Sequence, residues 1–446
     1  MFNFKRKKVS ARTVRRVLDR LRSGKVRGWE ALEKTLSPIY GDMDFGTARL
    51  LIEAATEPFA AKIYSGSDTI GYQLLDAAGR DEQEDRIPFI EQNYAKLSAN
   101  DNIQSRALRL LADIGTAKAL ESFWKLLKLP ESKGVELHVP MVPLKAGSNW
   151  RDDAAERAPY IFPAVFDLIG HSNDLPSICD LIVKYSQEGL LDLSNYPDTM
   201  AKLNDEAERS LNASLEYDAR CKELGLVEPT AEEFDEAFTA EQNLEWVLDV
   251  FRHTKFPEAE PLLNRVLAAS DLRMKIFAVA AALKQEMQVS SQLLNEIAET
   301  PARRATLWQL LEECGLLEHF PESYRTQRLL AEAEMVMWIR HPFEWDAVPE
   351  MLELQAIVEV EVEGETNHYY LFTFSHSEFS EGKTCVGIAG PYPKEGPPKI
   401  GGRWTFSHFK QLEELSLRQH AATFLDRVEE GIEFEIVPVS TGGNLD

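Results

Sequence analysis

The chain has 446 residues, of which 44% are hydrophobic, and its 73 acidic and 49 basic side chains give a net charge of −24. This composition provides a core for two or three globular domains, and because the sequence contains neither a run of about 18 apolar residues nor an apolar leader, we expect a cytoplasmic protein. So acidic a body repels phosphate backbones, which disfavours nucleic acid as the main ligand and favours a basic partner protein, although many of the charges serve only to keep the surface solvated.

The first 27 residues carry the opposite charge. They hold eleven Lys and Arg against the single Asp19, a net of +10 that leaves −34 on the other 419 residues. Ser10 can cap a helix over residues 10–23 with one apolar stripe: Val14, Val17, Leu18 and Leu21. Such a helix could dock its stripe on the first helical repeat, lie on an anionic membrane with Phe2 and Phe4 inserted, or contact nucleic acid. We favour docking, which presents three arginines to solvent, to nearby acidic residues or to a partner: Arg12, Arg15 and Arg16.

Helical periodicity continues along the chain, and a repeat becomes visible. We expect helices over residues 29–36, 44–57, 63–78 and 87–97. Residues 106–128 then read as helix, Ile-Gly, short loop and helix, and residues 160–184 repeat this order. With Gly115 and Gly170 aligned, the apolar positions of the second helix coincide: Leu120 with Leu175, Trp124 with Cys179 and Leu127 with Ile182. Since one such repeat cannot bury its stripe alone, neighbours must stack, which predicts an extended binding surface.

Two segments interrupt the repeats. Residues 131–159 read as an irregular excursion, which is either a contact region or a plain insertion. Residues 186–240 form an acid-rich insertion with fourteen acidic and four basic side chains, helical over residues 200–224. Helical segments then return at residues 243–253, 257–263, 271–283, 290–298, 302–314 and 324–339. These segments give four recognisable helix pairs, and up to six in all.

The pairs resemble HEAT repeats, in particular the short bacterial form first described in phycobilin lyases. The match is best over one repeat, at Arg106, Ala107, Leu110, Leu111, Ile114, Gly115, Ala119, Leu120, Leu126 and Leu127. The resemblance covers about half of residues 100–300 and implies a HEAT-like α-solenoid, which we expect over residues 1–350. HEAT arrays are mostly scaffolds for protein contacts, and no residue set here supports the lyase chemistry.

From residue 351 the periodicity becomes that of strands. Val358, Val360 and Val362 alternate with glutamates, and residues 368–375 return as a second strand after a turn. We expect further strands at residues 384–389, 402–406 and 432–439, a proline- and glycine-rich loop over residues 390–401 and a largely helical segment over residues 409–430. Residues 351–446 are therefore predicted to form a small α+β domain with an antiparallel sheet. Its stretches 386–393 and 404–409 are similar to the ends of other bacterial HEAT-repeat proteins, a resemblance that implies no activity.

The residues that could carry chemistry form no strong motif. Cys385 lies in an apolar strand with His376 and His408 in or beside other strands, but a buried thiol is usually inert and no oxyanion-hole pattern accompanies it. His368, His376 and His408 lack metal-ligand spacing, and no phosphate-binding motif follows residues 387–390. The four cysteines form no C-x-x-C pair: Cys179, Cys221, Cys314 and Cys385. We therefore expect no catalysis, no cofactor and no metal.

Several aromatic and basic residues are candidates for partner contacts. Trp150 and Trp404 lie in loops or at loop edges among Gly, Ser, Lys and Arg, where an aromatic beside a cation is common at contact surfaces. We expect Trp150, Arg403 and Trp404 to contact a partner, together with Tyr392 in the loop of residues 390–401.

Three classes of function remain. We favour a non-catalytic scaffold for protein–protein interaction that binds a partner through the helical repeats. A sharper form is an immunity protein that neutralises a basic toxin such as a nuclease by covering the surface that meets nucleic acid. Nucleic-acid binding in the manner of HEAT-like DNA repair proteins would need a basic concave face, which the net charge of −34 on residues 28–446 disfavours. An enzyme with a cysteine-based site in the C-terminal domain is the third class.

Overall fold

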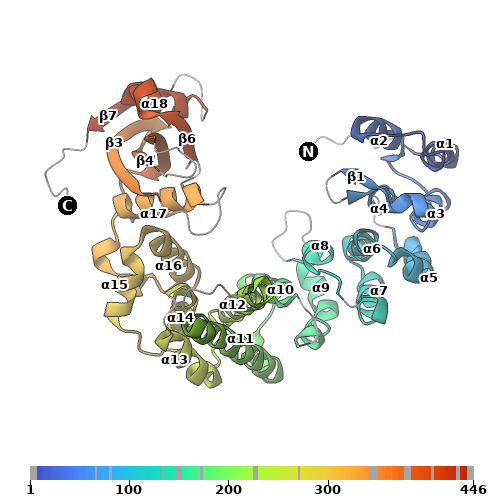
Figure 1. Cartoon of the computed structure of the whole chain (residues 1–446), viewed down its shortest axis with the longest axis horizontal. Helices are drawn as coiled ribbons and strands as arrows, with labels where there is room; N and C mark the ends of the chain where they lie inside the picture. Colours follow the sequence, from blue (N-terminus) through green and yellow to red (C-terminus); the bar gives the residue numbers. More distant parts are fainter. Residues whose placement is uncertain are drawn as a thin grey trace. The chain divides into compact units, whose positions relative to one another are not determined.

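The chain forms two compact units in the computed structural model, residues 1–256 and 257–446 (Figure 1). The structure describes residues 8–65, 68–79, 83–132, 134–145, 153–170, 174–224, 230–269, 272–340, 349–362, 364–375, 383–402, 406–427 and 432–438. The predicted class, a mainly helical chain followed by a small antiparallel sheet, is confirmed. The boundary between the units lies earlier than the predicted position near residue 350, because the helices after residue 257 group with the sheet on which the last of them packs.

The first unit is built almost entirely of helices. In chain order they are α1 (Ala11–Arg22), α2 (Trp29–Leu36), α3 (Phe45–Ala54), α4 (Ile70–Gly79), α5 (Ile87–Leu97), α6 (Asp101–Ile114), α7 (Ala117–Leu127), α8 (His138–Met141), α9 (Ala154–Ile161), α10 (Leu175–Gln187), α11 (Pro197–Leu224) and α12 (Ala231–Phe251). Each helix packs mainly on helices one or two positions away along the chain, as α4 on α6, α5 on α7 and α10 on α12 do.

The anchor glycines of the predicted repeat have the expected backbone. Gly115 (φ 66°) ends α6 and Gly170 (φ 82°) precedes α10, both in the left-handed region that favours glycine. The first repeat is confirmed as α6 and α7. The second is only partly right, because its first helix, α9, ends at Ile161 rather than continuing to the Ile-Gly pair. Pro163 lacks the N–H that would continue the helix, and a short 3-10 turn covers Phe166–Leu168 instead.

Three further elements differ from the predictions. Residues 63–65 and 68–69 form the short antiparallel strands β1 (Ile63–Ser65) and β2 (Asp68–Thr69), and α4 starts only after them, since the Thr69 hydroxyl accepts a hydrogen bond from the Tyr72 N–H. The predicted helix over 243–253 is the end of the longer α12, which begins at residue 231. The predicted helix over 409–430 is α18 (Leu417–Leu425), started by a capping box between Ser416 and Gln419.

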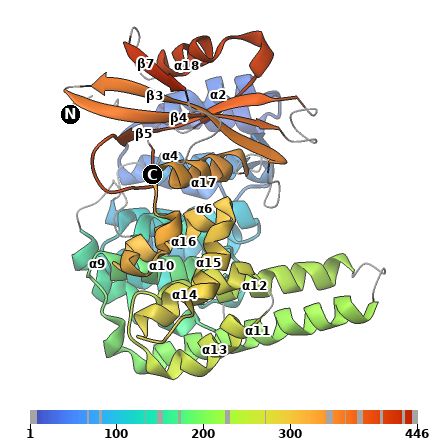
Figure 2. The ribbon, with the colours of Figure 1, turned by 90° about the vertical axis from the view of Figure 1, so that its left-hand side faces the viewer.

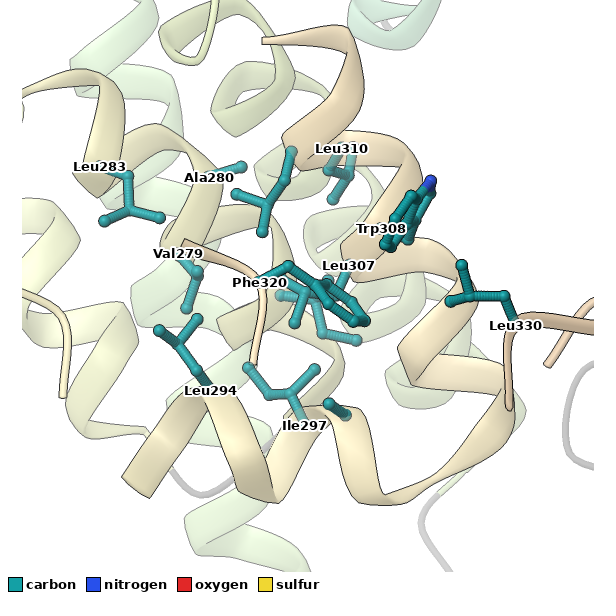
Figure 3. Close-up of a cluster of buried hydrophobic side chains, with 13 residues drawn as sticks. Val279, Ala280, Leu283, Leu294, Ile297, Leu307, Trp308, Leu310, Phe320 and Leu330 are labelled. Carbon is teal, nitrogen blue, oxygen red and sulfur yellow. The ribbon is translucent and has the colours of Figure 1, made fainter. Parts of the chain in front are cut away.

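The second unit begins with five helices. These are α13 (Glu260–Ala268), α14 (Leu272–Lys284), α15 (Ser291–Glu299), α16 (Pro301–Glu313) and α17 (Gln327–Arg340). Figure 3 shows their shared core, in which Trp308 of α16 packs edge-on against Phe320 with ring centroids 4.9 Å apart. Around this pair lie buried aliphatic residues of α14, α15, α16 and α17, including Val279, Ile297, Leu307 and Leu330.

A five-stranded antiparallel sheet follows, in the order β6-β5-β4-β3-β7. Its strands are β3 (Met351–Val362), β4 (Glu365–Ser375), β5 (Cys385–Pro393), β6 (Phe406–Gln411) and β7 (Phe434–Pro438). One face, with Val358 and Leu371, packs on α18, and the other, with Phe372 and Phe374, packs on α17 (Figure 2). The sheet is therefore covered on both faces. Successive residues of β4 point to opposite faces, which explains why six residues in a row are buried in this strand.

Buried arginines fasten the helices of both units. The Arg106 guanidinium of α6 donates to Asp76 at 2.8 Å and to Asp113 at 2.7 Å while it is almost fully buried. Arg304 of α16 donates to the Ala298 carbonyl at 2.7 Å and to Glu332 at 2.9 Å. In each case one guanidinium links its own helix to residues of a neighbouring element.

None of the described helices combines the length and apolar character that a membrane span requires.

Candidate binding surfaces

The longest helices of the first unit form an acidic hairpin, α11 and α12. They pack on each other along most of their length and project together beyond the neighbouring helices (Figure 2). Small and aliphatic residues of the two helices are buried: Leu203, Ala207, Leu211, Ala237, Ala240 and Leu244. Fourteen acidic and four basic residues lie within the two helices, which gives a net charge of −10. This hairpin contains residues 197–224 and 231–240 of the predicted acid-rich insertion, and its second helix also includes most of the segment predicted as a separate helix over residues 243–253.

Several hairpin carboxylates have partners inside the structure, among them Asp249 of α12, which pairs with Arg252. Glu206 pairs with Arg209 within α11, and Glu233 of α12 pairs with Arg220 of α11 at 2.7 Å. Within the described part of the chain, six exposed carboxylates of the hairpin form no ion pair: Asp198, Asp205, Glu216, Glu223, Asp235 and Glu236. These side chains are available to cations of another molecule.

An exposed aromatic residue lies near the start of α12, directly before two of these carboxylates. Phe234 is 55% exposed, and its ring stacks on that of Phe238, one turn further along α12, with centroids 6.2 Å apart and an interplanar angle of 13°. Asp235 and Glu236 follow it directly and are exposed. A large apolar group held rigidly within a charged rim is the usual arrangement of an interaction hot spot. Our sequence analysis missed this residue, although an aromatic pair at i and i+4 inside an acidic segment is a readable signal.

The start of α12 fixes this end of the hairpin. The Thr230 hydroxyl accepts from the Glu233 N–H, and the Thr230 N–H donates to the Glu233 carboxylate at 2.9 Å, which completes a capping box. The hydrogen bonds from Thr230, together with Arg220, lower the pKa of Glu233. The carboxylate one residue before Phe234 therefore stays ionised and immobile at neutral pH.

The second charged surface is the exposed side of α1. The prediction that its stripe docks on the fold is confirmed, because Val14, Val17, Leu18 and Leu21 are all buried and α1 packs on α3 and on the 3-10 turn after α2. The opposite side lines a shallow hollow of about 580 Å³, with these residues: Arg12, Arg15, Arg16, Asp19, Arg20, Ser23 and Lys25. The three arginines predicted to face outward do so, and the hollow brings them together with Arg20 and Lys25.

Tyr392 is a wrong prediction, because it does not lie in an exposed loop. Strand β5 continues through Pro393, so that the Tyr392 ring is fully buried against Tyr370, with centroids 5.8 Å apart. Its hydroxyl donates to Glu334 of α17 at 2.7 Å, and the same carboxylate accepts from the N–H groups of Gly401 and Gly402. Tyr392 therefore fastens the sheet and the following loop to α17. The other predicted contact residues, Trp150, Arg403 and Trp404, lie outside the described residues.

The candidate chemistry of the sheet domain gains no support from the geometry. Cys385 is 3% exposed at the start of β5, and burial raises the pKa of its thiol, which disfavours the reactive thiolate. His376 lies outside the described residues, and His368 is bound to Glu359 at 2.9 Å. Among the residues that the structure describes, no group of three or more His, Cys, Asp or Glu is placed to hold a metal ion.

Comparison with known proteins gives no relative: neither a family model, nor a curated protein, nor a solved structure matches this chain.

Proposed function

We propose that this chain is a non-catalytic scaffold for protein–protein interaction, a HEAT-like α-solenoid whose acidic hairpin α11–α12 binds a basic partner protein. The observation that carries the proposal is the hairpin itself, which holds six exposed carboxylates without ion pairs along its two helices and an exposed phenylalanine near the start of α12. A basic surface with an apolar recess is the complement of such a surface.

Helix packing supports the solenoid part of the proposal. Helices of the first unit contact mainly the helices next to them along the chain, as repeat arrays do. Arg106, the arginine of the best-matching repeat, ties α6 to α4 through Asp76. In a repeat array, each helix pair has an apolar stripe that is buried only when the next pair stacks on it. The apolar stripes then serve for stacking, and the outer surface and insertions such as the hairpin remain for binding.

The charge of the hairpin determines the class of partner and the conditions of binding. Carboxylates on exposed helices attract cations over roughly 10 Å at 0.1 M salt and over about 3 Å at 1 M salt. Such a surface steers a basic partner into place and contributes chiefly to association rate and specificity, while the buried aromatic contact limits dissociation. Binding should therefore weaken with salt without being abolished.

A basic nuclease toxin is one partner of this kind, and the chain would then act as an immunity protein. The hairpin carboxylates would occupy the cationic surface that otherwise meets nucleic acid phosphates. In that case the purified complex should lack nuclease activity and regain it when the hairpin is altered.

The test is an affinity purification of the full-length tagged protein from its native cells with two matched variants. Asp235→Lys/Glu236→Lys changes the hairpin, and Glu258→Lys/Glu296→Lys makes the same charge change at exposed positions of the second unit. We expect one abundant basic protein that the wild type and the control retain at low salt and that the hairpin variant loses. The proposal is refuted if the hairpin variant retains the same protein equally well, or if no protein is retained.

A further inference from the structure

The exposed side of α1 carries cations that the fold does not use. Arg22, near the end of the same helix, shows what a structural arginine looks like here, since its Nε donates to Glu57 Oε2 at 2.9 Å and its Nη2 binds the other carboxylate oxygen. In contrast, no carboxylate among the described residues forms an ion pair with the cations around the hollow: Arg12, Arg15, Arg16, Arg20 and Lys25. Asp19, the one acid lining the hollow, lies 3.7 Å from Arg22.

Two features of these cations oppose the stability of α1, although Arg20 in its last turn is favourably placed for the helix dipole. The first turn of α1 contains Arg12 and no acidic residue, although the N-terminal end of a helix dipole favours negative charge. Arg12, Arg16 and Arg20 follow each other at intervals of four residues, which brings like charges onto one face about 6 Å apart along the helix axis. In a chain with 73 acidic residues, a cluster left without anionic partners indicates an external anion.

The surroundings of the cluster favour a lipid surface as that anion. Trp29, the first residue of α2, is 51% exposed and follows Lys25 and Arg27 by a few residues, and an exposed tryptophan beside cations is typical of protein surfaces at the membrane interface. The sequence before α1 adds Phe2, Phe4 and four consecutive cations at residues 5–8. Within the first unit, α1 and α2 lie at one end and α11 and α12 at the other (Figure 1), so a flat anionic surface can meet the cluster without covering the acidic hairpin.

We propose that the exposed face of α1 is a peripheral docking site for anionic phospholipid headgroups, with Arg12, Arg15, Arg16, Arg20 and Lys25 as the cationic contacts and Trp29 as the interfacial anchor. Because the apolar stripe of α1 is buried in the fold, the helix docks by headgroup contact and does not insert its stripe into the acyl region. The site is separate from the acidic hairpin and does not depend on the proposed protein partner.

The experiment is co-sedimentation of the full-length protein with vesicles of phosphatidylcholine alone and with about 30% phosphatidylglycerol, at about 50 mM and about 500 mM salt. Arg12→Glu/Arg16→Glu tests the site, and Lys96→Glu/Lys118→Glu is the control, because it makes the same charge change at exposed residues of the same unit. We expect salt-sensitive binding to the anionic vesicles only, unchanged in the control and weakened about 30-fold or more in the α1 variant, from roughly five-fold per cation.

A second readout tests the placement of Trp29. Brominated anionic lipids should quench part of the tryptophan fluorescence of the bound wild type, and that part should disappear in Trp29→Phe. The proposal is overturned if the wild type does not bind anionic vesicles, if both double variants bind equally, or if duplex DNA in equal phosphate concentration displaces the vesicles completely. It is also overturned if vesicle binding is replaced by salt-sensitive self-association, which would identify a second copy as the occupant.

Discussion

Arg106→Met tests whether buried arginines hold the helix pairs together. The guanidinium is 6% exposed and donates to two carboxylates, those of Asp76 on α4 and Asp113 on α6, at 2.8 and 2.7 Å. Methionine keeps the aliphatic part of the side chain and its packing, so the substitution removes the charge and the hydrogen bonds with little change in volume. The effect therefore isolates the polar connection between α4 and α6.

The magnitude follows from how well the two carboxylates can be solvated again. A hydrogen bond to a charged group contributes about 1.5–3 kcal/mol, and a fully buried charge left without a partner costs about 3–5 kcal/mol. Asp76 is 31% and Asp113 24% exposed, so water recovers part of the loss. We expect Arg106→Met to lower the free energy of unfolding of the first unit by about 2–3 kcal/mol, which corresponds to about 5–10 °C in Tm for a unit of this size.

The assay is calorimetry of the full-length protein together with hydrogen exchange of peptides from α6 and α7, because the two units can unfold in separate transitions. Arg109→Met is the control, since Arg109 lies half-buried on the same helix and forms no ion pair within the described residues. It should change stability by less than about 0.5 kcal/mol. If Arg106→Met changes stability as little as Arg109→Met, the buried ion pairs do not hold the repeat together and the reasoning is wrong.

Two further substitutions test single contacts. Tyr185→Phe removes the hydrogen bond from the buried hydroxyl to the Leu144 carbonyl (2.9 Å) and should cost about 1–3 kcal/mol at pH 7. Burial raises the pKa of Tyr185 to about 12, so the hydrogen bond stabilises the fold fully below pH 10 and this stabilisation is lost between about pH 10 and 12. Urea titrations should show the free energies of unfolding of the wild type and Tyr185→Phe converging in that window. A difference in unfolding free energy that stays constant with pH would contradict the assignment. Gly402→Ala would place a Cβ within 2.8–2.9 Å of Gly390 backbone atoms, and we expect a loss of about 1–3 kcal/mol in the second unit, refuted if its urea midpoint is unchanged.

Helices were predictable wherever an apolar stripe and a cap coincided. The stripe of Val14, Val17, Leu18 and Leu21 with Ser10 before it gave α1 within one residue at each end, and its burial was predicted as well. Where the stripe continued past a backbone constraint, the prediction failed. Pro163 stopped the first helix of the second repeat, and Thr69 started α4 seven residues later than the apolar pattern suggested. The missing N–H of a proline and the cap from a threonine hydroxyl set these two helix boundaries, and neither can be predicted from the spacing of hydrophobic residues.

The tertiary role of a polar or aromatic side chain was much harder to read. Tyr392 follows Gly and Pro residues that are typical of a loop, yet β5 runs through it. Glu334, 58 residues earlier, accepts a hydrogen bond from its hydroxyl. No local signal connects these two residues. Arg22 and Arg16 are likewise equivalent in sequence, and only the fold shows that one of them has Glu57 as a partner.

The charge distribution was the part of the candidate sites that sequence could locate, because it depends on composition along a segment and not on contacts. We propose that the carboxylates and Phe234 of the hairpin bind a basic protein surface, whereas the cations that line the hollow of α1 and the exposed Trp29 bind an anionic lipid surface. Both surfaces belong to the same unit and carry opposite charges on separate helices, so the two proposals are compatible in one molecule. If the two sites act together, vesicles that recruit the wild type should also recruit its basic partner, and Arg12→Glu/Arg16→Glu should abolish that recruitment while leaving the soluble complex intact.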